Sequence, residues 1–402
     1  MNKEEHMIAW KRRKHPVLRN LMIDILCAGI ALVIFALFHH VLPRKQESIG
    51  IVIPNPYEAQ TGKREEETET IVSVTEFHPT LMLASADNTA GTWTTADGGQ
   101  TMLTAAKGRS SRKNNGGGGM NSKGGSALTE TGDEGALDED DTPIAEKFAE
   151  RYTEQVVITE NSYSSPDVSI TVTEETTADG RITYYLADIY IRNITSFRSA
   201  FAKDTYGSGY RDSIENLAAL NNAMIAINGD YYGNTNEGVV IRNGIIYRAN
   251  PTNCDVCVLY YDGSMQVMPG SAFTIEDAIA DGAWQAWTFG PALLDTDGSV
   301  LTSFSSTSRI ISANPRTAIG YYEPGHYCMV VVDGRGESAG ITLPQLSQLF
   351  FDLGCKAAYN LDGGNSSIMV WQDEIINQPS GGGRESSDAL LITEVRSYEK
   401  AV

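Results

Sequence analysis

The stretch that decides the fold is MVVVDGRGESAGITLPQLSQLFFDLGCKAAYNLDGG, residues 329–364. It opens with MVVVD, a short apolar run that predicts a buried strand. Thr342 and Gln345 then form a predicted capping box, and apolar side chains recur at helical spacing until Gly354. KAAYNL predicts a second strand. We therefore expect a β-α-β unit whose two strands run parallel and are joined by a right-handed crossover.

Polar clusters follow both predicted strands. DGR, residues 333–335, and DGG, residues 362–364, would leave the sheet at one carboxyl edge, where open α/β sheets bind ligands. NGD, residues 228–230, follows another predicted helix and strand and is expected to join them. Each cluster alone has an alternative interpretation as an ordinary turn. Because three such clusters recur, the sequence favours one polar pocket in which glycines expose backbone amides.

The remaining pattern places this unit in one folded domain. DVSITVTEE and RITYYLADIYIR alternate as strands do, and AMIAI predicts a buried strand. DSIENLAALNN predicts a helix that Asp212 caps. We expect an α/β (mixed α+β) fold over residues 144–402: a single globular domain with a mixed sheet, helices packed on it, and the β-α-β unit near the C-terminus.

The first third of the chain predicts a different organisation. Residues 18–42 approach the apolar length of a transmembrane helix, and the basic residues before them predict a cytoplasmic N-terminus, residues 1–17. A cleaved signal peptide is the alternative, but no matching cleavage site follows. Residues 43–143 have the composition of a disordered stalk, which would be extracellular. The expected location is therefore the cell membrane, with a single span, a bilayer contact through residues 18–42 and an extracellular catalytic domain.

Charge and cysteine content narrow the partners. The chain of 402 residues has a formal net charge of −20, which argues against nucleic acid as a partner. Arginine nevertheless supplies most basic residues after residue 150, and guanidiniums bind anionic groups in bidentate fashion. The cysteines leave two readings open, a tetrahedral metal site or disulfides of unassigned pairing, among Cys254, Cys257, Cys328 and Cys355.

Four motifs together resemble a known family. AINGDYYG, NPRTAIGY, the block from VVVDGRG to LDGGNSS, and GGGR occur in the order typical of phosphodiester glycosidases. The resemblance covers the chain from about residue 157. It implies hydrolysis of sugar-1-phosphodiesters, such as N-acetylhexosamine-1-phosphate linkages in surface polysaccharide, to a free sugar and a phosphomonoester. Bacterial members are associated with exopolysaccharide at the cell surface.

The resemblance also implies roles for the residues in these motifs. Asp362 is expected to act as base or nucleophile, with Asp333 as its catalytic partner, and their separation would distinguish retention from inversion. Arg316, Arg335 and Arg384 are expected to hold the phosphate. The remaining expected ligands of the sugar hydroxyls or phosphate oxygens are Asn228, Asn360, Gly363, Gly364, Asn365 and Ser366.

Two other functions fit the same residues. A metal-dependent phosphodiesterase would bind Ca²⁺ or Mg²⁺ through candidate ligands Asp230, Asp333 and Asp362. A non-catalytic module would bind an envelope glycan by stacking sugar rings on aromatic side chains, the candidates being Tyr231, Tyr232, Trp284 and Trp287. Labelled water distinguishes the first two, because a glycosidase places the label on the sugar and a phosphodiesterase places it on the phosphate.

Overall fold

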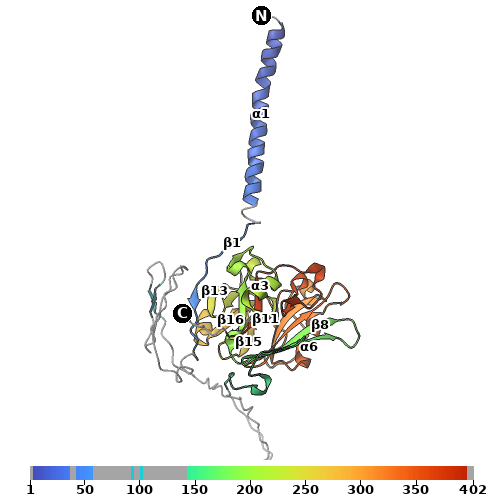
Figure 1. Cartoon of the computed structure of the whole chain (residues 1–402). Coiled ribbons are helices and arrows are strands. Elements are labelled where there is room, and N and C mark those ends of the chain that lie inside the picture. Colours follow the sequence, from blue (N-terminus) through green and yellow to red (C-terminus); the bar gives the residue numbers. More distant parts are fainter. Residues whose placement is uncertain (1–2, 37–41, 58–91, 95–99, 103–142, 396–402) are drawn as a thin grey trace, which may run out of the picture. The chain divides into compact units, whose positions relative to one another are not determined.

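The computed structural model describes residues 3–36, 42–57, 92–94, 100–102 and 143–395. Strands predominate and form three large sheets, with helices packed on them (Figure 1). The seven-stranded sheet has the order β19 (Ala357–Asn360), β17 (Arg316–Glu323), β18 (His326–Val332), β8 (Thr183–Ile191), β7 (Val168–Thr176), β6 (Ser162–Ser164), β5 (Val157–Ile158). The five-stranded sheet has the order β21 (Glu374–Ile375), β20 (Met369–Trp371), β11 (Ala223–Asn228), β22 (Asp388–Thr393), β9 (Phe197–Phe201).

The third sheet has six strands, and two further pairs are short. The six-stranded order is β15 (Met265–Pro269), β14 (Asp255–Tyr260), β16 (Ala283–Thr288), β12 (Val239–Arg242), β13 (Ile245–Ala249), β2 (Ile51–Val52). The short pairs are β1 (Arg44–Lys45) with β10 (Gly207–Ser208), and β3 (Thr92–Thr94) with β4 (Gln100–Met102). The α-helices are α1 (Lys3–Ala36), α3 (Ile214–Asn221), α4 (Ile275–Ala280), α5 (Ser308–Ile311) and α6 (Leu343–Asp352).

The predicted β-α-β unit is present with one correction. β18, α6 and β19 follow one another, and the Thr342–Gln345 capping box is confirmed. However, β17 lies between the two strands and pairs antiparallel with both, so β18 and β19 run in the same direction without being neighbours. Every strand pair that the structure describes is antiparallel, so the predicted mixed sheet is wrong.

The core explains why β18 is apolar on both faces. Its residues Met329 and Val331 join the inner core, to which the three large sheets all contribute. Val330 and Val332 face the other way, against Leu346 and the rest of the apolar stripe of α6. Helices α3 and α4 cover the outer faces of the five- and six-stranded sheets in the same way. The cap of α3 is Ser213, one residue after the predicted Asp212.

Residues 42–57 belong to the folded part, although the sequence places them in the stalk. β1 pairs with β10, and β2 extends the six-stranded sheet beside β13. Ile53 is only 1% exposed and packs in the core beneath α4. The predicted boundary at residue 144 leaves out this segment, because its apolar run, residues 49–53, is short and is separated from the rest of the domain by residues 58–142. Apart from the β3–β4 hairpin, the rest of the predicted stalk lies outside the described residues.

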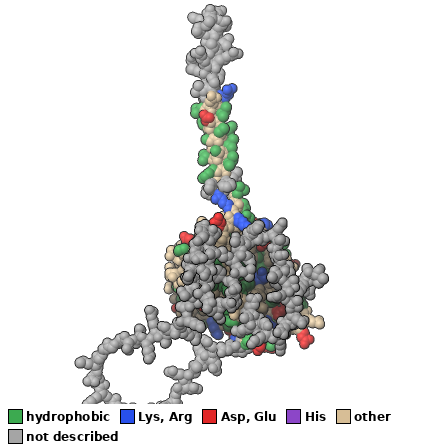
Figure 2. Space-filling view, turned by 90° about the vertical axis from the view of Figure 1, so that its left-hand side faces the viewer, with side chains coloured by type: hydrophobic (Ala, Val, Ile, Leu, Met, Phe, Trp, Pro, Cys, Tyr) green, Lys and Arg blue, Asp and Glu red, His purple; other side chains and the backbone are tan. Residues whose placement is uncertain are grey.

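The described residues include no helix that is long and apolar enough to cross a membrane, so the predicted span of residues 18–42 is not supported. Side chains are described for residues 19–35 of α1, and these are exposed and apolar apart from Arg19, Asn20 and Asp24 (Figure 2). Residues 37–41 of the predicted span lie outside the described residues. The extracellular location stays a prediction.

Candidate active site

The site lies where the ends of two sheets meet. Asp362 follows β19 of the seven-stranded sheet, and Asn228 ends β11 of the five-stranded sheet. The Asn228 side-chain amide donates to the Asp362 carbonyl oxygen at 2.7 Å, and the Asp362 N–H donates to the Gly229 carbonyl at 3.3 Å. The NGD and DGG clusters therefore come together, as predicted. Gly364 has φ +70°, in the left-handed region that favours glycine.

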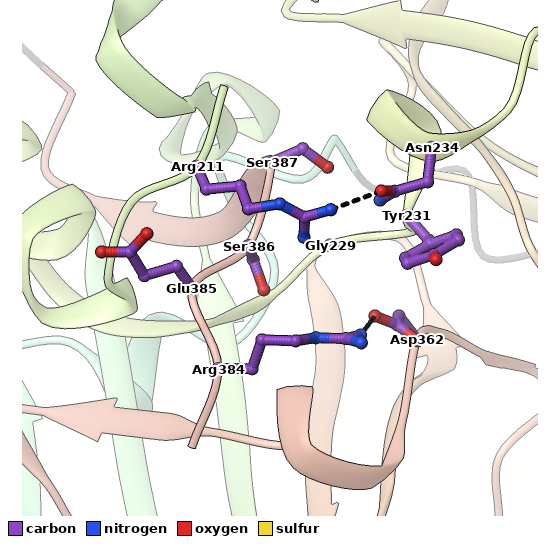
Figure 3. Close-up of a pocket in the computed structure, with 9 residues that line it drawn as sticks. All are labelled: Arg211, Gly229, Tyr231, Asn234, Asp362, Arg384, Glu385, Ser386 and Ser387. Atoms are coloured by element: carbon purple, nitrogen blue, oxygen red, sulfur yellow. Dashed lines mark hydrogen bonds and ion pairs between the residues drawn. The ribbon is translucent and has the colours of Figure 1, made fainter. Parts of the chain in front are cut away.

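Asp362 and Arg384 form the central pair of the site (Figure 3). Arg384 Nη2 donates to Asp362 Oδ2 at 2.7 Å, and Arg384 Nε donates to Ser366 Oγ at 2.9 Å. The Asp362 side chain is only 15% exposed. Burial raises the pKa of this carboxyl, although Arg384, Ser366 and the Gly363 amide act against that rise. The Arg384 guanidinium also lies 5.6 Å from the Tyr231 ring centre.

Two cavities share this pair. The smaller is a narrow pocket with room for about one water molecule, and Figure 3 shows its lining residues: Arg211, Gly229, Tyr231, Asn234, Asp362, Arg384, Glu385, Ser386 and Ser387. The larger is an open depression of about 290 Å³ lined by Tyr231, Arg309, Arg335, Asp362, Gly363, Gly364, Asn365 and Arg384. Asp362, Arg384 and Tyr231 belong to both, so the central pair lies at the border between the narrow pocket and the open depression.

The charge of this region is opposite to that of the chain. Four arginines, Arg211, Arg309, Arg335 and Arg384, line the two cavities, against the carboxylates of Asp362 and Glu385. The whole chain has a formal net charge of −20. Guanidiniums gathered in a concave site on an acidic protein are suited to binding an anionic ligand.

Two predicted ligands lie close to the central pair and position it. Asn228 is fully buried, and its Oδ1 accepts from Thr317 Oγ1 at 2.7 Å while its amide group holds the Asp362 loop. Ser366 is also fully buried, and its hydroxyl oxygen accepts a hydrogen bond from the Arg384 guanidinium. Neither side chain lines a cavity. Asn228 and Ser366 instead position Asp362 and Arg384, which do line the cavities.

Three other predicted site residues lie outside the cavities. Asp333 is 5% exposed and receives hydrogen bonds from Asn377 Nδ2 at 2.8 Å and from the Gln378 amide at 3.0 Å. Its carboxylate therefore fixes the loop after β21 instead of joining Asp362. Asn360 is buried and donates to the Gly290 carbonyl at 2.8 Å. Neither side chain lines a cavity, because each is bonded to a neighbouring loop, Asp333 to residues 377–378 and Asn360 to Gly290.

Arg316 is the third, and its side chain is buried. Its guanidinium donates to the backbone carbonyls of Ile310, Ser312 and Ile341, the Ser312 bond being 2.7 Å long. Burial lowers the pKa of Arg316 to about 10, with a contribution from the nearby Arg335. Arg316 therefore fixes the backbone around α5, next to the open depression.

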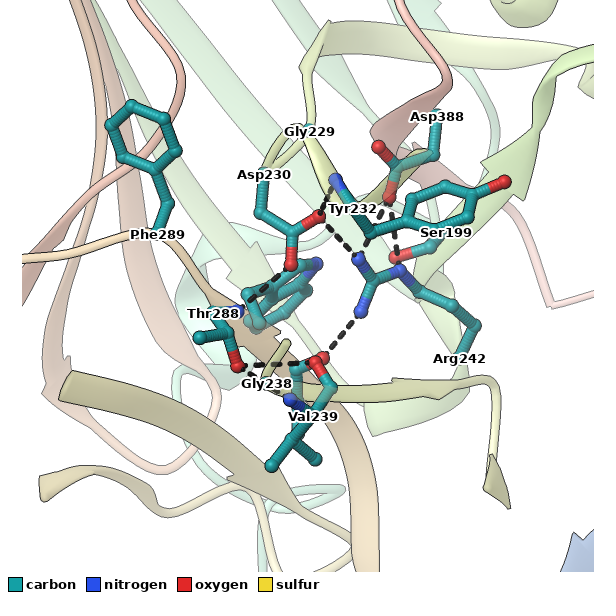
Figure 4. A network of polar contacts seen from close by, with 12 residues as sticks. Ser199, Gly229, Asp230, Tyr232, Gly238, Val239, Arg242, Thr288, Phe289 and Asp388 are labelled. Atoms are coloured by element: carbon teal, nitrogen blue, oxygen red, sulfur yellow. Dashed lines mark hydrogen bonds and ion pairs between the residues drawn. The ribbon is translucent and has the colours of Figure 1, made fainter. Parts of the chain in front are cut away.

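The proposed metal ligands are not assembled into one site. Asp230 is buried and binds Arg242 Nη2 at 2.9 Å and the Thr288 amide at 2.8 Å (Figure 4). Asp333 and Asp362 have the separate partners described above. Within the described residues, no three His, Cys, Asp or Glu side chains are grouped as a metal site. The four cysteines of the domain are free thiols, and Cys328 Sγ lies 3.8 Å from Cys355 Sγ.

The aromatic candidates divide in the same way. Tyr231 is 37% exposed and lines both cavities, whereas the other three are buried in the cores, namely Tyr232, Trp284 and Trp287. The sequence analysis missed several lining residues, namely Arg211, Arg309, Asn234, Glu385, Ser386 and Ser387. They lie outside the motifs, in loops or, for Arg309, in the short helix α5. The excess of arginine over lysine in the domain is the one sequence signal that points toward Arg211 and Arg309.

Comparisons with known proteins agree with the motifs. YomE, an SPbeta prophage-derived uncharacterized protein of Bacillus subtilis, is 28% identical over 274 residues, which are 62% of this chain and 42% of that protein. The human N-acetylglucosamine-1-phosphodiester alpha-N-acetylglucosaminidase is 36% identical over 78 residues, 19% of this chain and 15% of that enzyme. The chain thus spans less than half the length of these curated relatives.

A solved structure and a family model complete the comparison. The catalytic domain of the zebrafish N-acetylglucosamine-1-phosphodiester alpha-N-acetylglucosaminidase, auto-inhibited by its pro-peptide, aligns with a TM-score of 0.45 and 19% identity, covering 57% of this chain and 83% of that one. The family model for phosphodiester glycosidases matches residues 221–393, which include both loops of the site. The resemblance drawn from the sequence motifs is therefore confirmed: residues 221–393 match the phosphodiester glycosidase family.

Proposed function

We propose that this protein hydrolyses the glycosidic bond of sugar-1-phosphodiesters and releases a free sugar and a phosphomonoester. The observation that carries the proposal is the Asp362–Arg384 pair at the border of two cavities. The open depression, about 290 Å³ in volume, offers the Tyr231 ring and the Asn365 amide to a sugar residue. The arginines of the same depression suit the phosphodiester.

The chemistry of the leaving group fits a site with one central carboxylate. When the bond between the sugar C1 and the phosphate oxygen breaks, the electron pair remains on a phosphate that is already a stable anion. Such a leaving group needs less protonation than an alkoxide, so a second carboxyl acting as acid is not required. Arg384 is placed to hold the phosphate charge as it develops.

Asp362 then serves the other half of the reaction. Its carboxylate either takes the proton of the attacking water or attacks C1 directly, and in both cases it stabilises the positive charge that develops on the sugar ring. In the first case the water oxygen forms the new bond to C1 and its proton passes to Asp362. In the second case Asp362 forms an ester with C1, and water then hydrolyses this ester, which releases the sugar and restores the carboxylate. The proposed substrate class includes N-acetylhexosamine-1-phosphate linkages, which the name of the human relative supports. Surface polysaccharide as the carrier of these linkages rests on the sequence resemblance alone.

The test uses the full chain and a panel of hexose- and N-acetylhexosamine-1-phosphodiesters, in both anomers, in ¹⁸O-labelled water. We expect free sugar that carries the label, together with an unlabelled phosphomonoester. Asp362→Asn should lower kcat by about 10²–10⁴-fold, the usual contribution of a positioned acid–base group. Arg181→Gln, a change at an exposed arginine outside both cavities, should leave the rate unchanged.

Other outcomes would replace this proposal. Sugar-1-phosphate as product, with the label on phosphate, would identify a phosphodiesterase, and loss of that activity in EDTA would add a metal. Binding of the panel without turnover, unaffected by Asp362→Asn, would identify a glycan-binding module.

A further inference from the structure

Two guanidiniums in the open depression have no carboxylate partner among the described residues. Arg335 Nη1 donates to Asn365 Oδ1 at 3.0 Å and its Nη2 donates to Asn314 Oδ1 at 2.8 Å, and both acceptors are neutral amides. The exposed Arg309 side chain has no described hydrogen bond or ion pair. Asp362 is the one carboxylate that lines the depression, and it is paired with Arg384. The charges of Arg309 and Arg335 are therefore not neutralised within this region.

Neighbouring residues hold Arg309 and Arg335 at the same depression. Asn314 accepts from Arg335 through Oδ1, while its Nδ2 donates to the backbone carbonyls of Arg309 and Ser312, each at 2.9 Å. One side chain thus connects the Arg335 guanidinium to the backbone of α5. The buried Arg316 also holds this helix, because its guanidinium donates to the backbone carbonyls of Ile310 and Ser312.

The backbone of Arg335 adds an independent observation. Its φ is +63°, a left-handed conformation that is uncommon for a residue other than glycine. Such a conformation is unfavourable and persists where the surroundings fix it, often at a functional site. Here the two amide acceptors hold the guanidinium over Gly364, where an added Cβ would lie 3.2 Å from the Arg335 nitrogens.

We propose that the group on the far side of the scissile phosphate carries a second anion, a phosphate or a carboxylate, which Arg309 and Arg335 bind. This inference rests on the proposed function for the identity of the first anion. The scissile phosphodiester has a single negative charge, and Arg384 beside Asp362 is placed to bind it. A neutral acceptor group would leave the guanidiniums of Arg309 and Arg335 without an anionic partner, although neighbouring side chains hold both residues at the depression. A second anion would give each of them a charge-assisted partner.

The activity test compares three substrates that share one sugar-1-phosphodiester and differ in the acceptor: propyl, 3-phosphopropyl or 3-carboxypropyl. We expect the wild-type full chain to show a kcat/KM at least tenfold higher for an anionic acceptor, mainly through a lower KM. The phosphate and carboxylate arms show which anion is preferred. Arg309→Gln should remove this preference by lowering kcat/KM for the anionic acceptors at least tenfold more than for the propyl ester, and Arg181→Gln should change none of these values.

Equal kcat/KM for all three substrates would overturn the inference, and so would an Arg309→Gln loss that is the same for each of them. A binding measurement tests the same inference without requiring that the protein hydrolyse these substrates. Calorimetry on the wild-type chain should show 1,3-propanediol bisphosphate binding at least tenfold more tightly than propyl phosphate, a difference that Arg309→Gln abolishes. Tighter binding of the bisphosphate without any hydrolysis would contradict the proposed function but not the second anion-binding site. Hydrolysis without a preference for an anionic acceptor would contradict the second anion-binding site but not the proposed function.

Discussion

At the scale of single residues, the environment of Asp362 controls its protonation. Burial raises its pKa, while the charge of Arg384 opposes the rise. If the ionised carboxylate is the active form, kcat/KM falls as the pH decreases through that raised pKa. The acid limb of the pH profile then lies above the ordinary range for an aspartate.

Replacing Arg384 tests this coupling. Arg384→Gln removes the opposing charge, so the acid limb of kcat/KM should move to higher pH, and kcat should fall by about 10²–10³-fold through loss of a charge-stabilising donor. Arg384→Lys keeps the positive charge but cannot donate to Ser366 and Asp362 at the same time as the planar guanidinium does. It should therefore lower kcat, with a smaller shift of the acid limb of kcat/KM than Arg384→Gln. An acid limb at the same pH in all three proteins would show that Asp362 does not titrate in that profile.

Sequence motifs identified the centre of the site better than its surroundings. Asp362, Arg335 and Arg384 follow from motifs, and the structure places all three around the open depression. Asp333 and Arg316 lie in equally specific motifs, yet their side chains bind backbone groups of neighbouring loops. A motif records that a residue type is needed and does not record the direction of its side chain, which depends on loops far away in the sequence.

At the scale of elements, local signals were reliable and long-range pairing was not. The capping box and apolar stripe of α6 are contained within a dozen residues, so the sequence predicts that helix well. The order of strands depends on β17, which pairs both with β18, the next strand, and with β19, which follows only after α6. For this reason the direction of β18 and β19 was predicted correctly, whereas their adjacency was not.

The segment that contains β2 gives an element-scale prediction. Ile53 is 1% exposed, and its amide donates to the Gly244 carbonyl at 2.7 Å. Ile53→Ala should lower the free energy of unfolding by about 2–5 kcal/mol, as expected for deleting a buried isoleucine side chain. Ile51→Ala is the matched control, because Ile51 lies two residues earlier, in β2, but is 37% exposed, and it should have little effect. Urea unfolding of the full chain measures both. Equal midpoints for the wild type and Ile53→Ala would show that the segment adds nothing to the stability of the domain.

At the scale of the whole molecule, a buried ionic group joins two of the sheets beneath the site. Arg242, at the end of β12 in the six-stranded sheet, is 1% exposed (Figure 4). It binds Asp230, which follows β11, and Asp388, which begins β22, each at 2.9 Å. A Cβ at Gly229 would lie only 2.1 Å from Asp388 Oδ1, so this position accepts glycine alone. Through the Gly229 carbonyl, the group is connected to the Asp362 loop.

This group makes the stability of the whole fold depend on pH. Two carboxylates share one guanidinium out of contact with water, so burial and the neighbouring Asp230 raise the pKa of Asp388 to about 7. An unfolded aspartate titrates near about 4, so between these values the folded chain holds a proton that the unfolded chain releases. The stabilising contribution is therefore complete below about pH 4 and is lost as the pH rises through about 7.

Thermal unfolding of the full chain at pH 5 and pH 8 measures this effect. The wild-type Tm should fall between the two values by more than that of Asp388→Asn, because the amide keeps the shape of the side chain but has no proton to lose in this range. Arg242 would still find an acceptor oxygen on the amide. Asp352→Asn, a change at an exposed aspartate of α6, should retain the wild-type fall in Tm. If Asp388→Asn retains it too, the pH dependence arises from the general acidity of the chain, and the buried group is ionised throughout this range.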